Sequence, residues 1–148
     1  MQTILDLDYH DNSLFGNGDI DAIKYTFNNA KKSGFDTILW APMICSKAYY
    51  PSQVAKPISR SRHYQGSHFL DELLARFDPL EQAIKIAGEF NLELLFYFRL
   101  FDDFIPGYED DFLNSRPDLW WQSRGGNYQF KGWPSYHQPE VRGYKLRL

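Results

Sequence analysis

The stretch from Asp78 to Asp103, DPLEQAIKIAGEFNLELLFYFRLFDD, constrains the possible fold more than any other part of the sequence. Asp78 suits the N-cap of a helix, Pro79 suits its first position, and Glu81 completes a pattern like a capping box. Apolar side chains then recur at helical spacing on one face, namely Leu80, Ala83, Ile84, Ala87 and Phe90. The first half of the stretch therefore predicts an amphipathic helix.

The second half of this stretch predicts a strand. Asn91 suits the left-handed conformation that often ends a helix. Leu92 to Leu100 then runs mostly apolar and aromatic, which is typical of a strand that is covered on both faces. Arg99, Asp102 and Asp103 come where this strand is expected to emerge. Helix and strand together form half of a β/α repeat.

Two further strands and a helix are predicted upstream. Thr3 to Tyr9 and Asp36 to Met43 have strand patterns, and the polar residues from Asp11 to Gly18 predict a loop after the first strand. A helix is expected from Gly18 or Asp19 to about Ser33, with Gly34 as its left-handed stop. Its buried stripe is predicted to consist of Ile20, Ile23, Phe27 and Ala30.

The remaining segments are long and mostly irregular. Ile44 to Phe77 is expected to contain one short helix, from about Phe69 to Arg76. Phe104 to Gln138 is expected to contain a helical turn near Glu109 to Ser115. Pro139 to Leu148 starts a last helix, whose apolar side carries Val141, Tyr144 and Leu148.

The predicted elements alternate strictly between strand and helix. Such alternation predicts an α/β fold with a parallel sheet and right-handed crossovers. Each helix-to-strand joint is short, at Gly34 and Asn91, whereas each strand-to-helix joint is long. The long loops must therefore lie at the carboxyl ends of the strands, the face that holds the site in α/β barrels and open α/β sheets.

A partial (β/α)8 TIM barrel is the architecture that we expect from these repeats. Three β/α repeats use all 148 residues, whereas a whole barrel needs about 250. Leu148 also falls inside a predicted amphipathic helix. We therefore expect residues 1–148 to be the N-terminal portion of a single barrel domain that has been truncated. A small open-sheet protein is the alternative, although its three strands would leave exposed edges.

Composition excludes several classes of function. The net charge is −3, whereas nucleic-acid-binding domains normally carry a basic face. A single cysteine, Cys45, rules out an internal disulfide and a cysteine-based zinc cluster. No signal peptide is visible and no apolar run approaches the roughly 20 residues that span a bilayer, so we expect a cytoplasmic protein by default.

Asp8 and His10 are the first candidate site residues. Two residues that are two apart on a strand point to the same side. Asp8 and His10 are therefore predicted to hold a substrate hydroxyl or, with further ligands, a metal ion. A metal site normally needs three or four ligands, so we assign no metal here. The alternative is the solvated start of a loop.

Three more candidates lie at the ends of the other strands. Trp40 either stacks on the face of a sugar or fills the core. Arg99 has a planar fork of donors that suits carboxylates and hydroxyls, or it pairs with Asp102 and locks the loop. Asp102 and Asp103 are adjacent, so they do not by themselves form an acid/base pair across a glycosidic bond.

The long loops are unusually rich in aromatic residues, which either line a groove or form a folded lid. They are Tyr49, Tyr50, Tyr64, Tyr108, Trp120, Trp121, Tyr128, Trp133 and Tyr136. His63 and His68 are expected to be surface histidines. Gly16 to Gly18 lies between a strand and a helix, but Asp21 stands where a dinucleotide loop has its third glycine. We therefore expect that no nucleotide binds there. We expect no other cofactor either.

Several segments also resemble a known group of proteins. DPLEQAIKIAGEFNLELLFYFRLFDD, SRPDLWW at Ser115–Trp121 and QPEVRGYKLRL at Gln138–Leu148 are similar to the N-terminal part of uncharacterised TIM-barrel families described as glycoside-hydrolase-like. The strands LDLDYHD and GFDTILWAPM are similar to that group as well. The resemblance implies a (β/α)8 barrel and hydrolysis of carbohydrate. In related barrels the catalytic carboxylates follow later strands, so no catalytic residue is carried over.

Our leading hypothesis is that the chain is part of a barrel glycoside hydrolase that acts on O-glycosyl bonds. The sugar-binding side of the cleft is predicted to be lined by Asp8, His10, Trp40, Arg99 and Asp102. The remainder of the barrel would supply the two catalytic carboxylates. The alternatives are a metal-dependent hydrolase that uses Asp8 and His10, and a carbohydrate-binding barrel without catalysis. We expect no nucleic-acid partner and no membrane association.

Overall fold

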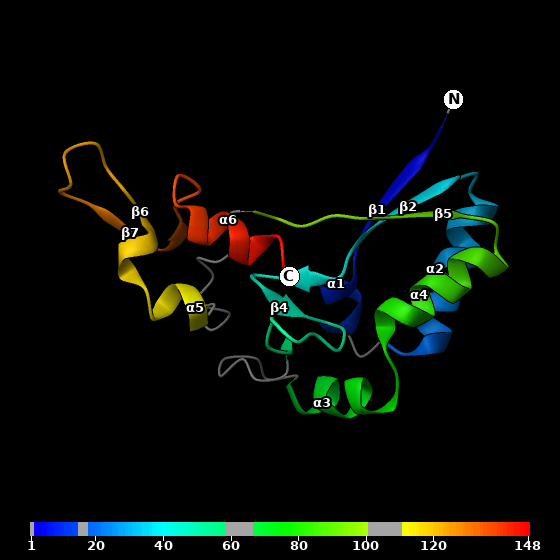
Figure 1. Ribbon diagram of the computed structural model, residues 1–148. Coiled ribbons are helices and arrows are strands. Elements are labelled where there is room, and N and C mark those ends of the chain that lie inside the picture. Colours follow the sequence, from blue (N-terminus) through cyan, green and yellow to red (C-terminus); the bar gives the residue numbers. More distant parts are fainter. Residues whose placement is uncertain (1, 15–17, 59–66, 101–110) are drawn as a thin grey trace.

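The protein is built on a three-stranded parallel sheet with the order β1-β2-β5 (Figure 1). The computed structural model describes residues 2–14, 18–58, 67–100 and 111–148. The strands are β1 (Ile4–Asp8), β2 (Thr37–Ala41) and β5 (Glu93–Phe96). Ile4 aligns with Thr37, and Thr37 aligns with Glu93. The predicted α/β class and parallel pairing are confirmed.

Two helices pack against the sheet, α2 (Ile20–Lys32) and α4 (Pro79–Glu89). The Asp19 side chain caps α2 by accepting from the Ala22 N–H at 2.8 Å. The Asp78 side chain caps α4 by accepting from the Leu80 N–H at 2.9 Å. Both helices then end as predicted, because Gly34 and Asn91 adopt positive φ angles of 85° and 49°.

The helices lie side by side and bury a continuous core against one face of the sheet. Lys24 of α2 and Glu89 of α4 form an ion pair at 3.3 Å between the two helices. The predicted stripe of α2 is confirmed, since Ile23, Phe27 and Ala30 are buried and the partly buried Ile20 packs against the same core. The largest core cluster also includes residues of the strands, of α4 and of the connections that follow β1 and β2, among them Tyr9, Ile38, Trp40, Tyr49, Ile58, Leu70, Ala83 and Ile86.

One residue of the predicted α4 stripe is misplaced. Ile84 is 53% exposed, and the buried position is taken by Ile86. Both choices fit a helical period together with Ala83 and Ala87, so the spacing alone did not distinguish them. The rotation of α4 about its own axis, which its packing against the sheet sets, places Ile86 rather than Ile84 in the core.

The second face of the sheet is open, contrary to the expectation for Leu92 to Leu100. Leu5, Ile38 and Leu94 pack into the helix-side core, so alternation places their neighbours on the other face. That face, which we call the open face, carries Ile4, Asp6, Asp8, Leu39, Glu93, Leu95 and Tyr97, together with the buried Thr37 and Ala41 of the central strand. Leu95 is 41% exposed there. The strand is also shorter than predicted, because β5 ends at Phe96.

All three long connections follow the carboxyl ends of strands, as predicted. The first contains α1 (Tyr9–Leu14), and the second contains β3 (Met43–Ile44), β4 (Lys47–Ala48) and α3 (Ser67–Arg76). The third contains α5 (Asp111–Asn114), η2 (Pro117–Leu119), β6 (Trp120–Gln122) and β7 (Gln129–Pro134), and leads to α6 (Pro139–Lys145). The two hairpins, β3–β4 and β6–β7, were not expected from the sequence.

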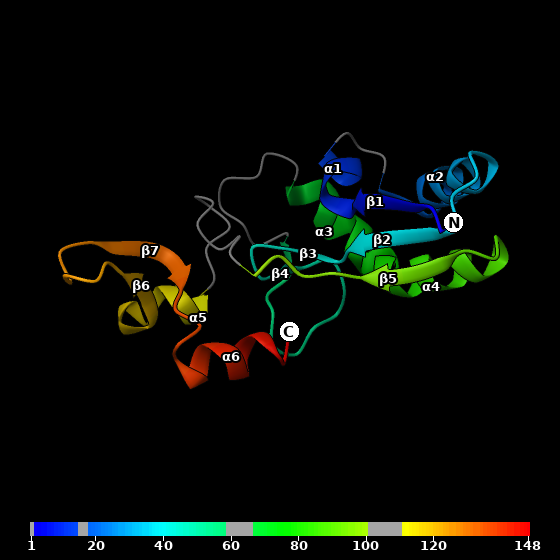
Figure 2. The ribbon, with the colours of Figure 1, turned by 90° about the horizontal axis from the view of Figure 1, so that it is seen from above.

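The third connection forms a separate lobe. Figures 1 and 2 both place β6, β7 and α5 at the end of the molecule opposite α2 and α4, with α6 between. A small core of Leu113, Leu119 and Val141 holds this lobe together. Leu148 does not continue the apolar side of α6, because the helix ends at Lys145, and it packs instead near Met43 and Ala55. In the described part of the chain, no helix is both long and apolar enough to cross a membrane.

Candidate ligand-binding site

Asp8 and Arg99 form an ion pair at the carboxyl end of the sheet. Arg99 Nη2 lies 3.0 Å from Asp8 Oδ2, and the Asp8 side chain is largely buried. Asp8 Oδ1 accepts from the backbone N–H of His10 at 3.0 Å, so both carboxylate oxygens are engaged. Asp102, the partner that we had considered for Arg99, lies outside the described residues. The open face therefore brings together the ends of β1 and of the segment after β5.

Tyr97 and Asp6 extend this pair into a cluster. Arg99 Nη2 donates to the Tyr97 hydroxyl oxygen at 3.3 Å. The backbone N–H of Tyr97 donates to the carbonyl of Trp40 at 3.1 Å, which continues the sheet by one residue. Burial raises the pKa of Tyr97; the hydrogen bond from Arg99 opposes this rise, and a hydrogen bond with Asp6 adds to it. We call Asp6, Asp8, Tyr97 and Arg99 the carboxyl-edge cluster.

The carboxyl-edge cluster offers both donors and acceptors within a small area. The Arg99 side chain is 46% exposed, so a ligand is able to reach its guanidinium. Carboxylates accept hydrogen bonds, a guanidinium donates them, and a phenol does both. A polyhydroxylated ligand has groups that match each of them. Asp6 and Tyr97 were not among the predicted site residues, although alternation with Asp8 and Arg99 was a usable signal.

His10 occupies a different place from the one predicted. The strand ends at Asp8, and His10 belongs to α1, so the argument that both residues point alike along a strand is wrong. The cause is local, since the Asp8 carboxylate caps the first turn of α1. His10 is buried, and its Nδ1 is hydrogen-bonded with the Tyr49 hydroxyl. His10 therefore helps to anchor α1 beneath the carboxyl edge.

Trp40 is part of the core. It is 2% exposed, its ring stacks on Tyr9 at a centroid distance of 5.3 Å, and it meets Phe27 edge-on at 5.5 Å. Alternation along β2 turns Trp40 toward α2 and away from the open face. The core-filling alternative therefore describes Trp40, and its ring offers no accessible face to a sugar.

The described residues do not assemble a set of metal ligands. Within residues 2–14, 18–58, 67–100 and 111–148, no group of three or more His, Cys, Asp and Glu side chains is placed to hold an ion. Asp8 and His10 also have different partners, Arg99 and Tyr49. The positions of these side chains therefore do not support the hypothesis of a metal-dependent hydrolase. Gly16, Asn17 and His63 lie outside the described residues.

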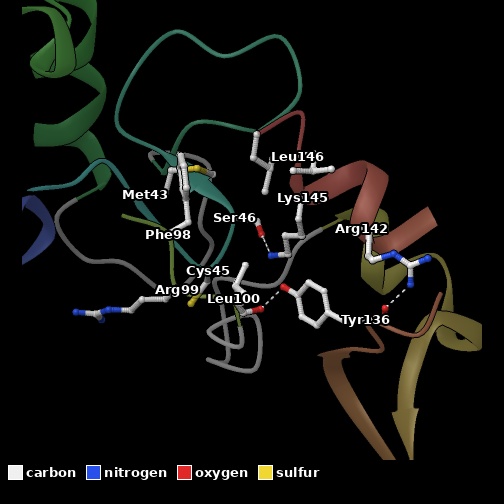
Figure 3. Close-up of a pocket in the computed structure, with 11 residues that line it drawn as sticks. Met43, Cys45, Ser46, Phe98, Arg99, Leu100, Tyr136, Arg142, Lys145 and Leu146 are labelled. Atoms are coloured by element: carbon white, nitrogen blue, oxygen red, sulfur yellow. Dashed lines mark hydrogen bonds between the residues drawn. The ribbon is translucent and has the colours of Figure 1, made fainter. Parts of the chain in front are cut away.

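A cavity of about 400 Å³ adjoins the cluster (Figure 3). It lies between the β3–β4 turn, residues 98–100 and α6, and Figure 3 shows the Arg99 guanidinium extending away from it. Lys145 Nζ is 2.5 Å from Ser46 Oγ, and the Tyr136 hydroxyl donates to the Leu100 carbonyl at 2.5 Å. The remaining lining is mainly apolar, with Met43, Cys45, Phe98, Leu146 and Leu148. This wall does not suit a polyhydroxylated ligand.

The fold is similar to that of the maltogenic alpha-amylase AmyB from Thermotoga neapolitana. The two structures agree with a TM-score of 0.55 at 13% sequence identity. The match covers 98% of this chain and 34% of the amylase, so the chain spans about a third of the length of that protein. No protein family and no curated protein matches the sequence. At this identity the likeness concerns the fold.

Proposed function

We propose that the chain is part of a glycoside-hydrolase-like protein and binds carbohydrate through the carboxyl-edge cluster. The observation that supports this most is the Asp8–Arg99 pair, which lies with Tyr97 at the carboxyl end of the parallel strands. This is the edge at which α/β folds bind their ligands. The similarity in fold to an amylase favours a sugar over other polyhydroxylated ligands.

A partial (β/α)8 barrel is the architecture that goes with this proposal. Both crossover helices pack against the same face of the sheet, α2 through Phe27 and α4 through Ile86. Helices on one face are expected of a barrel segment, whereas a doubly wound sheet has them on both faces. The open face would then belong to the barrel interior.

Arg99 and Asp8 have distinct roles in this proposal. The partly exposed Arg99 donates to sugar hydroxyls, while the largely buried Asp8 holds the guanidinium in place and accepts from a hydroxyl at its edge. His10 and Trp40 support the cluster from the core. Asp102 remains a proposed contact on the same loop. Hydrolysis would require an acid pair from other repeats, and without such a pair the protein would bind sugar and leave it intact.

Sugar binding by the 148-residue chain tests the proposal. Retention in affinity gels that contain soluble starch, xylan or a β-glucan, followed by calorimetry with an oligosaccharide of the retained type, measures the affinity. Arg99→Gln is expected to weaken binding by about 10- to 100-fold, since a hydrogen bond to a charged group is worth about 1.5–3 kcal/mol. Arg76→Ala, at an exposed arginine of α3, is the matched control.

Asp8→Asn refines this test. The amide oxygen still accepts from the His10 N–H, so α1 stays capped, but the ion pair with Arg99 is lost. Weaker binding with an unchanged melting profile is the expected result. Wild-type affinity in both Arg99→Gln and Asp8→Asn would overturn the assignment of the cluster. Retention by none of the polysaccharides, for a chain that circular dichroism shows to be folded, would overturn the function itself.

A further inference from the structure

The β6–β7 hairpin presents a row of aromatic rings at the surface. Trp121 pairs with Phe130 across the two strands, with ring centroids 5.1 Å apart, and Phe130 lies 5.6 Å from Trp133. Trp121 is 45% exposed. Large aromatic rings normally bury most of their area, so an exposed row of them indicates a surface that contacts something. We call these three residues the aromatic row.

Two hollows flank Trp121. The larger has a volume of about 450 Å³ and the smaller about 240 Å³, and Trp121 and His137 line both of them. The larger hollow falls within the roughly 300–1,000 Å³ that is typical of small-molecule sites. Its other walls are polar and come from the hairpin and from the segment before α6, with Asp118, Gln122, Arg124, Ser135 and Gln138.

This surface is held in shape by contacts beneath it. The Trp120 Nε1–H donates to the Leu113 carbonyl at 2.7 Å, and Leu119 is buried in the core of the lobe. Arg116 engages both carboxylate oxygens of Asp118, with Nε at 2.9 Å from Oδ1 and Nη2 at 2.6 Å from Oδ2. This pairing lowers the pKa of Asp118. The hollow therefore keeps a fixed carboxylate edge beside an exposed indole.

We propose that Trp121 and the larger hollow bind a neutral oligosaccharide, as a second carbohydrate site separate from the carboxyl-edge cluster. This inference rests on the proposed function. A sugar ring has an apolar C–H face that suits an indole and hydroxyls that suit amides, a carboxylate and a guanidinium. The hollow supplies these groups through Gln122, Gln138, Asp118 and Arg124. Asp118 and Arg124 in the lining, together with Arg116 and the nearby Glu140 behind it, carry no net charge, so the site favours an uncharged ligand.

Comparison of variants at the two sites tests the inference with the polysaccharide that retains the wild-type chain. Trp121→Ala is expected to reduce retention at least tenfold, because loss of a stacking ring removes the largest contact. Tyr25→Ala, at an exposed aromatic residue on α2, is the matched control and should bind like the wild type. Trp121→Phe keeps a ring and should retain an intermediate affinity.

A site-specific measurement covers the case in which Trp121→Ala does not fold. The indole Nε1–H signal of Trp121, assigned in a ¹⁵N–¹H spectrum by its absence in Trp121→Phe, should shift on titration with the oligosaccharide. The signal of the buried Trp40 should not shift. Wild-type affinity in a folded Trp121→Ala, or a Trp121 signal that stays in place while sugar binds, would overturn the second site.

Which variants lose sugar binding distinguishes the proposed function from the second site. If Arg99→Gln weakens binding and Trp121→Ala does not, the second site is wrong and the proposed function stands. If only Trp121→Ala weakens binding, the hairpin is the sugar site and the role of the carboxyl-edge cluster is wrong. Self-association through Trp121 with no sugar binding would identify the row as a protein interface and contradict the inference.

Discussion

At the level of single residues, Tyr9 links the end of the first strand to the core. Its hydroxyl donates to the Gly18 carbonyl at 2.5 Å, and its ring stacks on Trp40 and meets Tyr49 edge-on at 5.1 Å. Burial raises the pKa of Tyr9, and the negative charge of Asp19 raises it further. Tyr9 therefore fixes the path of the chain from β1 to α2 through one buried hydrogen bond.

Tyr9→Phe is expected to lower the free energy of unfolding at pH 7 by about 1 kcal/mol, since the buried Gly18 carbonyl loses its donor. Above pH 10 the unfolded chain loses the Tyr9 proton while the folded protein keeps it. The stability of the wild type therefore falls as the pH rises through this range, and the variant lacks this contribution. Urea titrations at pH 7 and 10.5 should show the difference between the two proteins shrinking. If the difference in the free energy of unfolding is the same at both pH values, Tyr9 is not the buried donor described here.

At the level of elements, the space around a glycine decides how its replacement by alanine changes the stability of the protein. A Cβ added to Gly88 would meet nothing within 4 Å, whereas one added to Gly18 would meet Leu73, Ser13 and Tyr9, each at 3.1 Å. Gly88 lies inside α4, and a glycine in a helix is destabilising because the unfolded chain gains freedom from it. The two positions therefore predict opposite results for one substitution.

Gly88→Ala is expected to stabilise the protein by about 0.5–1 kcal/mol. Gly18→Ala is expected to destabilise it by about 1–3 kcal/mol, because the methyl group crowds a packed junction. Thermal unfolding followed by circular dichroism measures both variants against the wild type. A loss of stability in Gly88→Ala would show that this side of α4 is covered.

The open face of the sheet governs the behaviour of the molecule as a whole. Apolar side chains of Ile4 and Leu95 lie there beside the partly buried hydrogen bond from Thr37 to Glu93. β1 and β5 are the outer strands of the described sheet, so each has one edge without a neighbouring strand in that sheet. Exposed edges and apolar faces favour association between chains.

The 148-residue chain is therefore expected to be poorly stable or to self-associate. Leu95→Glu should shift it toward the monomer in sedimentation velocity runs at increasing concentration. Ile84→Glu, which changes a similarly exposed side chain on the outer side of α4, should leave the association unchanged. A wild-type chain that is monomeric at every concentration and melts cooperatively would refute this expectation.

The sequence by itself determined what local physics controls. The caps at Asp19 and Asp78 and the left-handed residues Gly34 and Asn91 are set by neighbouring backbone groups, so short motifs predicted them correctly. The alternation of strand and helix likewise determined a parallel sheet with its long loops at the carboxyl ends. Arg99 and Asp8 were therefore placed at the correct edge.

Only the tertiary structure decided which of these residues meet. Asp8 pairs with Arg99, and His10 with Tyr49, because the register of the sheet and the packing of α1 bring distant segments together. Trp40 lies in the core since alternation along β2 turns it toward Phe27, a choice that its position at a strand end left open. The β6–β7 hairpin also escaped prediction, because it depends on cross-strand contacts between Trp121 and Phe130. Pairings of this kind arise from contacts between distant residues, which short sequence patterns do not encode.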